Sequence, residues 1–209
     1  MDARVNPNDP GRGPLIMSIT WILTSSALLV VAARFYVRHK VARAFTIEDW
    51  LMFAAVILEL AFQGCVTRAS EAGLGKHDAS LSYDEAVLLL KWTWISTTPA
   101  ILVSVVARIS IAVLLIRIFS RAKWLTIFLI YFTLLQSLAA VALIIIVWAQ
   151  VSPVKGLWDV LLPARRWDAA IQQNMAYATQ ALFTFSDLTY VLFPILVIFR
   201  LQMPLRQQL

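Results

Sequence analysis

Three ionisable side chains lie inside long apolar stretches of the sequence, where a charge is costly: Glu59, Arg108 and Asp187. On insertion scales, a charged residue at the middle of a membrane costs about 2.5–3.5 kcal/mol, so each should face other helices and have a partner. A cluster of this kind can bind a ligand, carry a proton, or only fix the packing of the helices. The sequence leaves these alternatives open.

Helix geometry brings the three residues to similar depths. Glu59 and Arg108 each lie about nine residues from the inner end of their stretches, which places them roughly 14 Å from the inner surface of the membrane. Asp187 lies roughly 20 Å from the same surface. Side chains lean toward the helix N-terminus, so Arg108 leans toward Asp187. We therefore predict one polar network or ligand site, in which further residues follow at helical spacing, although Ser and Thr also hold helices together in lipid. Its candidate residues are Glu59, Gln63, Ser104, Arg108, Asp187 and Tyr190, with Thr184 beside them.

Other residue types that carry chemistry do not form recognisable sites. Glu48 and Asp49 follow Thr46 and are interpreted as partners of a helix N-terminus, which Asp49 helps to cap. His77 stands beside Asp78 without a second cluster of metal-binding side chains, so we expect no metal site. The sequence also lacks a phosphate-binding glycine loop and a nucleophile elbow, so we assign no catalytic residue and no cofactor.

The elements that must position these residues are long and apolar. Each holds about 18 or more residues with few charges, the length that an α-helix needs to cross a membrane, and a backbone in lipid must satisfy its own hydrogen bonds. The chain is 60% hydrophobic and 14% charged, with a mean hydropathy of +0.76. We predict an all-α fold, a polytopic bundle of five transmembrane helices in a single domain, residues 1–209. The stretches are Leu15–Ala33, Trp50–Thr67, Trp92–Ile116, Trp124–Ala149 and Met175–Phe199.

The distribution of Lys and Arg predicts the orientation of the bundle. Nine of the 18 basic residues lie in the short first and third loops and the tail, and eight lie in the longer segments of the other side. Basic residues are denser in cytoplasmic loops, so the N-terminus should be outside and the C-terminus cytoplasmic. We expect Arg38 and Lys123 inside, and His77 and Trp158 outside. Anionic lipid headgroups explain the net charge of +6 better than nucleic acid does, because the basic residues form no patch interleaved with aromatic ones.

The sequence indicates where two helices start and which loop is the longest. Capping boxes predict that the second helix starts just after Thr46 and the third near Tyr83. The fourth loop, Gln150–Asn174, contains tryptophans and is expected to pack over the outer end of the bundle. It should do so without a disulfide, because Cys65 is the single cysteine.

Short landmarks, taken in chain order, resemble the fungal rhodopsin-domain family. This family consists of seven-helix membrane proteins and includes the membrane protein of the satratoxin mycotoxin cluster. No single landmark is specific, but the ordered set covers nearly the whole chain. The landmarks are Gly11-Arg12-Gly13-Pro14, Arg34-Phe35-Tyr36-Val37-Arg38, Glu48-Asp49-Trp50-Leu51, Gly73-Leu74-Gly75-Lys76-His77, Arg108-Ile109-Ser110, Arg117-Ile118-Phe119, Ser152-Pro153-Val154, Leu157-Trp158-Asp159, Asp187, Pro194 and Leu201-Gln202-Met203.

The resemblance implies association with fungal secondary-metabolite gene clusters and a place in the plasma membrane or an endomembrane. Family members usually continue through two further helices, so we expect this chain to be a shortened member, a truncated gene model or a fragment. Despite the family's name, a retinal Schiff base has no attachment site, because no lysine lies within the core of a predicted helix.

Three functions remain open. We expect a receptor-like or accessory membrane protein without enzymatic activity, whose partners are the lipid bilayer and a small hydrophobic metabolite. A membrane-embedded cyclase would instead use Glu59 or Asp187 as an intramembrane acid, kept protonated by desolvation. A small transporter or channel subunit would need polar lining on several helices. The sequence does not identify a ligand, a G-protein partner or an oligomeric state.

Overall fold

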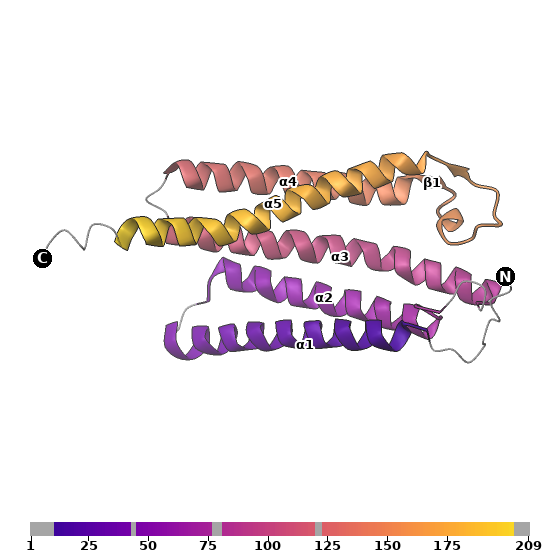
Figure 1. Cartoon of the computed structure of the whole chain (residues 1–209), viewed down its shortest axis with the longest axis horizontal. Coiled ribbons are helices and arrows are strands. Elements are labelled where there is room, and N and C mark those ends of the chain that lie inside the picture. Colours follow the sequence, from indigo (N-terminus) through magenta and orange to yellow (C-terminus); the bar gives the residue numbers. More distant parts are fainter. Residues whose placement is uncertain (1–10, 43–44, 77–80, 120–122, 203–209) are drawn as a thin grey trace, which may run out of the picture.

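Helices make up most of the chain (Figure 1). The computed structural model describes residues 11–42, 45–76, 81–119 and 123–202. The all-α class is confirmed. Several residues that served to predict the orientation lie outside the described ones, namely Arg4, Arg43, His77, Arg121 and Arg206. The elements are α1 (Gly13–Val37), η1 (Arg38–Ala42), α2 (Ile47–Glu71), α3 (Tyr83–Ile118), α4 (Lys123–Ala149), β1 (Val151–Ser152), η3 (Val154–Leu157), β2 (Arg165–Arg166) and α5 (Ala169–Gln202).

Four helical segments within the described residues are long and apolar enough to cross a membrane: Gly13–Lys40, Ile47–Glu71, Tyr83–Ile118 and Lys123–Ala149. They contain the first four predicted stretches, so the prediction that these stretches form helices able to cross a membrane is confirmed. The fifth predicted stretch falls in α5, a helix of 34 residues. Its crossing stays a prediction.

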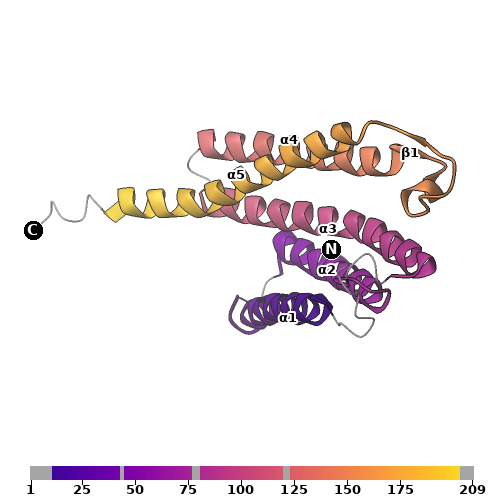
Figure 2. The same ribbon diagram turned by 45° about the vertical axis from the view of Figure 1, so that its right-hand side comes forward.

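The central helix of the arrangement is α3. It packs against α2 on one side and against α4 and α5 on the other, while α1 packs against α2 (Figures 1 and 2). A core of buried side chains lies between α3, α4 and α5 and includes Ala112, Leu115, Leu129 and Tyr190. Many large apolar side chains of α1 and α4 point outward, among them Leu29 and Leu138. Lipid tails are the natural surroundings of such a surface.

The predicted helix starts are confirmed. The carboxylate of Asp49 accepts from the backbone N–H of Thr46 at 3.0 Å and from its hydroxyl at 2.9 Å, and α2 begins at Ile47. Glu85 accepts in the same way from Ser82, at 2.9 Å for both donors. In each case the acidic side chain satisfies a donor that the first helical turn leaves free.

Glycine closes the turn after α2. Gly73 and Gly75 have φ angles of 109° and 89°, which side chains with a Cβ rarely adopt. The carbonyl of Gly75 accepts from the backbone N–H of Arg12 at 2.9 Å. A Cβ at position 75 would lie 2.5 Å from the backbone nitrogen of Gly13. The turn therefore ties the start of α1 to the end of α2.

The fourth loop contains two short strands that the sequence did not indicate. β1 and β2 pair antiparallel, with Val151 opposite Arg166. The loop also contacts the start of α3, because the Tyr83 hydroxyl donates to Asp159 at 2.6 Å. Leu157 is buried. These contacts hold the loop against the same end of the bundle at which α3 begins.

Candidate functional site

Arg108 and Asp187 meet between α3 and α5. The guanidinium Nη2 of Arg108 lies 2.7 Å from Oδ2 of Asp187. Its Nη1 donates to the backbone oxygen of Ser104 at 2.9 Å. The guanidinium carbon also lies 4.1 Å from the centre of the Phe183 ring. A hydrogen-bonded ion pair, a backbone acceptor and a cation–π contact together fix the position of the charge.

The two charges differ in exposure. The side chain of Arg108 is 13% exposed, whereas that of Asp187 is 55% exposed. The Nε of Arg108 is buried and has no hydrogen-bond partner among the described residues. Arg108 is thus the enclosed member of the pair, and Asp187 is the member that a solvent molecule, lipid or ligand can reach.

Glu59 and Gln63 lie elsewhere, between α1 and α2. Glu59 accepts from the hydroxyl of Thr24 at 3.2 Å, and the Gln63 amide donates to the hydroxyl of Thr20 at 3.2 Å. The structure therefore divides the predicted network into an Arg108–Asp187 pair and a separate Glu59 group. A ligand role for either group stays a prediction.

Tyr190 belongs to a third group, between α4 and α5. Its hydroxyl accepts from the Gln136 amide and lies close to the hydroxyl of Thr133, each at 3.2 Å. The Ser186 hydroxyl donates to the other end of the Gln136 amide. Thr184 hydrogen-bonds within its own helix, to the backbone oxygen of Gln180. Because Gln136 and Ser186 are almost fully buried, the hydrogen bonds of this group hold α4 and α5 together within the membrane.

A cavity of about 340 Å³ opens beside the Arg108–Asp187 pair, and we name it the outer cavity after the side on which the predicted orientation would place it. Ser104 and Phe183, both contacts of Arg108, belong to its wall. The wall contains polar and apolar residues of both α3 and α5. The lining consists of Phe62, Thr93, Ser96, Thr97, Ala100, Ile101, Ser104, Leu143, Ala176, Thr179, Gln180 and Phe183.

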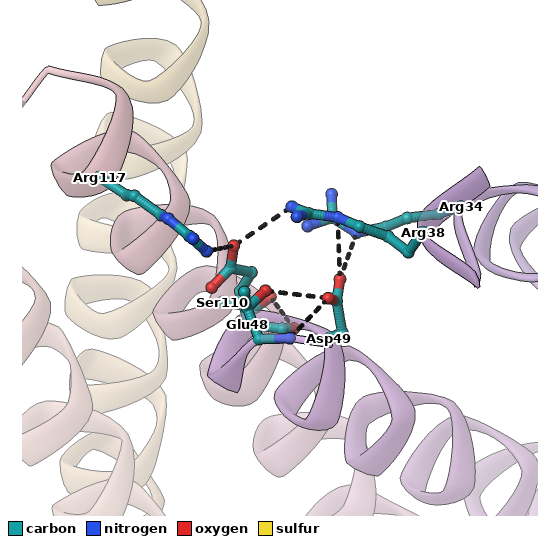
Figure 3. Close-up of polar contacts among 7 residues, drawn as sticks. Arg34, Arg38, Glu48, Asp49, Ser110 and Arg117 are labelled. Atoms are coloured by element: carbon teal, nitrogen blue, oxygen red, sulfur yellow. Dashed lines mark hydrogen bonds and ion pairs between the residues drawn. The ribbon is translucent and has the colours of Figure 1, made fainter. Parts of the chain in front are cut away.

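Charged residues also gather where α1 ends and α2 begins (Figure 3). Asp49 lies 3.2 Å from Nε of Arg34 and 3.6 Å from Nε of Arg38. Glu48 lies 3.2 Å from Nη2 of Arg38 and 3.1 Å from Nη1 of Arg117. Both carboxylates are about 2% exposed. We call this group of five residues the inner charge network, after the side on which the predicted orientation would place it.

The inner charge network joins three helices. Arg34 comes from α1, Glu48 from α2 and Arg117 from α3, and the Ser110 hydroxyl of α3 donates to the backbone oxygen of Glu48 at 2.9 Å (Figure 3). The capping role predicted for Asp49 is confirmed, but that prediction missed the ion pairs. Arginines at i and i+4 at the end of one helix, with two carboxylates at the start of the next, were the signal in the sequence.

Among the described residues, no group of three His, Cys, Asp or Glu side chains could hold a metal ion. The outer cavity likewise has no ionisable side chain in its lining. The arrangement offers recognition of shape and hydrogen-bonding groups.

Comparison with protein families matches the chain to the fungal rhodopsin domain over residues 33–209. Comparisons with curated proteins and with solved structures find no match. The matched region contains α2 to α5, the Arg108–Asp187 pair and the inner charge network. The match spans most of the chain and agrees with its membrane-crossing helices. The chain therefore belongs to the fungal rhodopsin-domain family and is a multi-pass membrane protein.

Proposed function

We propose that this protein is a receptor-like or accessory membrane protein that binds a small, hydroxylated hydrophobic molecule in the outer cavity. The observation that carries the proposal is the cavity itself, whose polar atoms lie between four helices. Small-molecule sites are typically apolar concavities with a few placed polar groups. The volume of about 340 Å³ is at the lower end of the range for such sites.

The hydrogen bonds of the cavity wall indicate which ligand groups would fit. The hydroxyls of Thr93, Ser96, Thr97 and Thr179 each donate to a backbone oxygen of their own helix. A hydroxyl whose proton is used still has lone pairs that accept. The wall therefore favours a ligand that donates hydrogen bonds, such as a terpenoid or polyketide alcohol. Metabolites of a fungal secondary-metabolite cluster, including mycotoxins, belong to this class.

Binding is favoured over catalysis by the position of the nearby carboxylate. Asp187 forms an ion pair with Arg108 and does not belong to the described lining of the cavity. A cyclase would need an acid at the cavity wall, where the described lining has none.

Five crossings with the N-terminus outside complete the proposal. The helix α5 has 34 residues and packs against α4 and α3, and 34 residues exceed the about 20 that a crossing needs. The exposed Arg117 and Lys123 lie at the end of the bundle that carries the inner charge network, which favours that end as cytoplasmic. The outer cavity would then open in the outer half of the membrane.

Photolabelling tests the proposed site. Purified protein in lipid nanodiscs is irradiated with a diazirine derivative of farnesol, and the labelled peptides are identified by mass spectrometry. We expect labelling of α3 and α5 residues of the cavity wall, with competition by unlabelled farnesol. Ala100→Trp fills the cavity and should abolish this labelling, whereas Ala181→Trp, on the exposed side of α5, should leave it unchanged. Labelling confined to lipid-facing positions would refute the proposal.

A further inference from the structure

A second cavity lies between α1, α2 and α3, on the other side of α3 from α5, and has a volume of about 170 Å³. Its wall is apolar except for two side chains, Thr24 and Glu59. The remaining lining residues are Ala27, Leu28, Val31, Met52, Ala55, Val56, Val103 and Ala107. We propose that this cavity binds a protonated lipophilic amine, with the Glu59 carboxylate as its counter-ion.

The first argument is charge. Glu59 lies twelve residues into α2 and accepts a hydrogen bond from Thr24, but within the described residues no basic side chain forms an ion pair with it. Arg108, the basic residue nearest in predicted depth, is paired with Asp187 on α5. A carboxylate inside a membrane is stable when a positive charge accompanies it. The described chain does not supply that charge, and a cationic ligand would.

The second argument comes from Gln63, one helical turn from Glu59. Its side chain is 1% exposed, and its Oε1 is buried without a partner. Exchanging the two ends of the amide would let Thr20 donate to Oε1 but would leave the amide nitrogen unpaired instead. In the amide orientation of the structure, the seam between α1 and α2 therefore leaves one buried acceptor unpaired, on a side chain next to the cavity-lining Glu59 in the helix but not itself in the described lining.

An ammonium group in the cavity would supply the positive charge that the described residues do not place beside Glu59. It carries one positive charge and as many as three N–H donors. Its hydrocarbon chain would lie against Val31, Met52 and Val103, which contribute apolar surface to the wall. Burial of that chain stabilises binding through the hydrophobic effect, while the carboxylate gives selectivity for an amine over a neutral molecule of the same shape.

A matched pair of probes tests this site independently of the outer cavity. The thermal unfolding of the protein in nanodiscs is measured with n-octylamine and with n-octanol, which share a chain and differ in charge. At about ten times its Kd, octylamine should raise the Tm by roughly 3–6 °C more than octanol does. An equal effect of the two probes on the wild-type protein would overturn the proposal.

Three variants locate the effect. Glu59→Gln keeps the shape of the side chain and removes its charge, so it should weaken octylamine binding at least about tenfold. Glu71→Gln makes the same change at an exposed position of the same helix and should leave binding unchanged. Ala107→Leu narrows the cavity without altering charge and should also weaken binding. A preference for octylamine that survives in both Glu59→Gln and Ala107→Leu would place the amine elsewhere.

Discussion

The side chains of Arg108 and Asp187, 79 residues apart in the chain, form an ion pair of 2.7 Å that joins α3 to α5. The pair connects the central helix to the last described one at the edge of the outer cavity. Because Arg108 is enclosed and Asp187 is half exposed, loss of either partner leaves the other in a different environment.

Arg108→Leu should lower the free energy of unfolding of the protein by about 1–3 kcal/mol, because it leaves Asp187 without its counter-charge. Adding Asp187→Asn should restore part of the loss. Adding Glu59→Gln should not, since Glu59 bonds to Thr24. Double-mutant cycles in nanodiscs measure the coupling, expected at about 0.5–3 kcal/mol for Arg108 with Asp187.

The exposed pair of Arg68 and Glu71, also at a short distance of 2.9 Å, is the control for that cycle. Its coupling should be at most about 0.5 kcal/mol, since both side chains are well exposed. Additive effects of Arg108→Leu and Asp187→Asn would show that the contact does not stabilise the bundle.

Glu48→Gln should destabilise the inner charge network far more than Arg117→Gln. Glu48 is buried and serves both Arg38 and Arg117, so its neutralisation removes a shared partner and should cost about 3 kcal/mol. Arg117 is 58% exposed and its loss should cost less than about 1 kcal/mol, because Arg38 still neutralises Glu48. Urea or thermal unfolding in detergent measures both values. Equal costs would contradict this account of the network.

Gln136→Leu should loosen the contact between α4 and α5. The substitution leaves the buried Ser186 hydroxyl without its acceptor and removes a donor from Tyr190. Interhelical hydrogen bonds in membranes contribute modestly, so the expected loss is about 1–2 kcal/mol. Ser137→Ala, which removes a hydrogen bond within α4 only, is the comparison and should cost less. Thermal denaturation followed by near-UV circular dichroism distinguishes the two variants.

Single-cysteine labelling tests the orientation. In a Cys65→Ser background, a membrane-impermeant maleimide should label Trp158→Cys on intact cells. It should label Lys123→Cys and Lys40→Cys only after permeabilisation. Lys40 stands in for Arg38 because Arg38 takes part in ion pairs. Labelling of position 158 only after permeabilisation would reverse the proposed topology.

Local signals predicted the helices well. The starts of α2 and α3 follow from capping boxes, whose chemistry depends on residues three positions apart. The meeting of Arg108 with Asp187 follows from depth and from the direction in which side chains lean. These features need little knowledge of how the helices are arranged.

The partners of Glu59 depend on how α2 is rotated about its own axis. The predicted depth placed Glu59 beside Arg108, but in the structure the rotation of α2 directs the Glu59 side chain toward Thr24 of α1. Helix rotation is set by packing along the whole interface, which a charge pattern does not determine. The inner charge network was missed for a related reason, because it requires the ends of α1 and α3 to meet at the start of α2.

One continuous helix, α3, contributes side chains to both cavities, to the Arg108–Asp187 pair and to the inner charge network. It supplies Ser96 to the outer cavity, Val103 to the Glu59 cavity, Arg108 to the ion pair and Arg117 to the inner charge network. A helix moves as a rod, so a turn or slide of α3 at one depth shifts its side chains at the others. Pro99 interrupts the backbone hydrogen bonds of this rod beside the outer cavity. A ligand that moved α3 at one cavity would therefore also move the Arg117 end of the helix, and any such coupling would act equally in both directions.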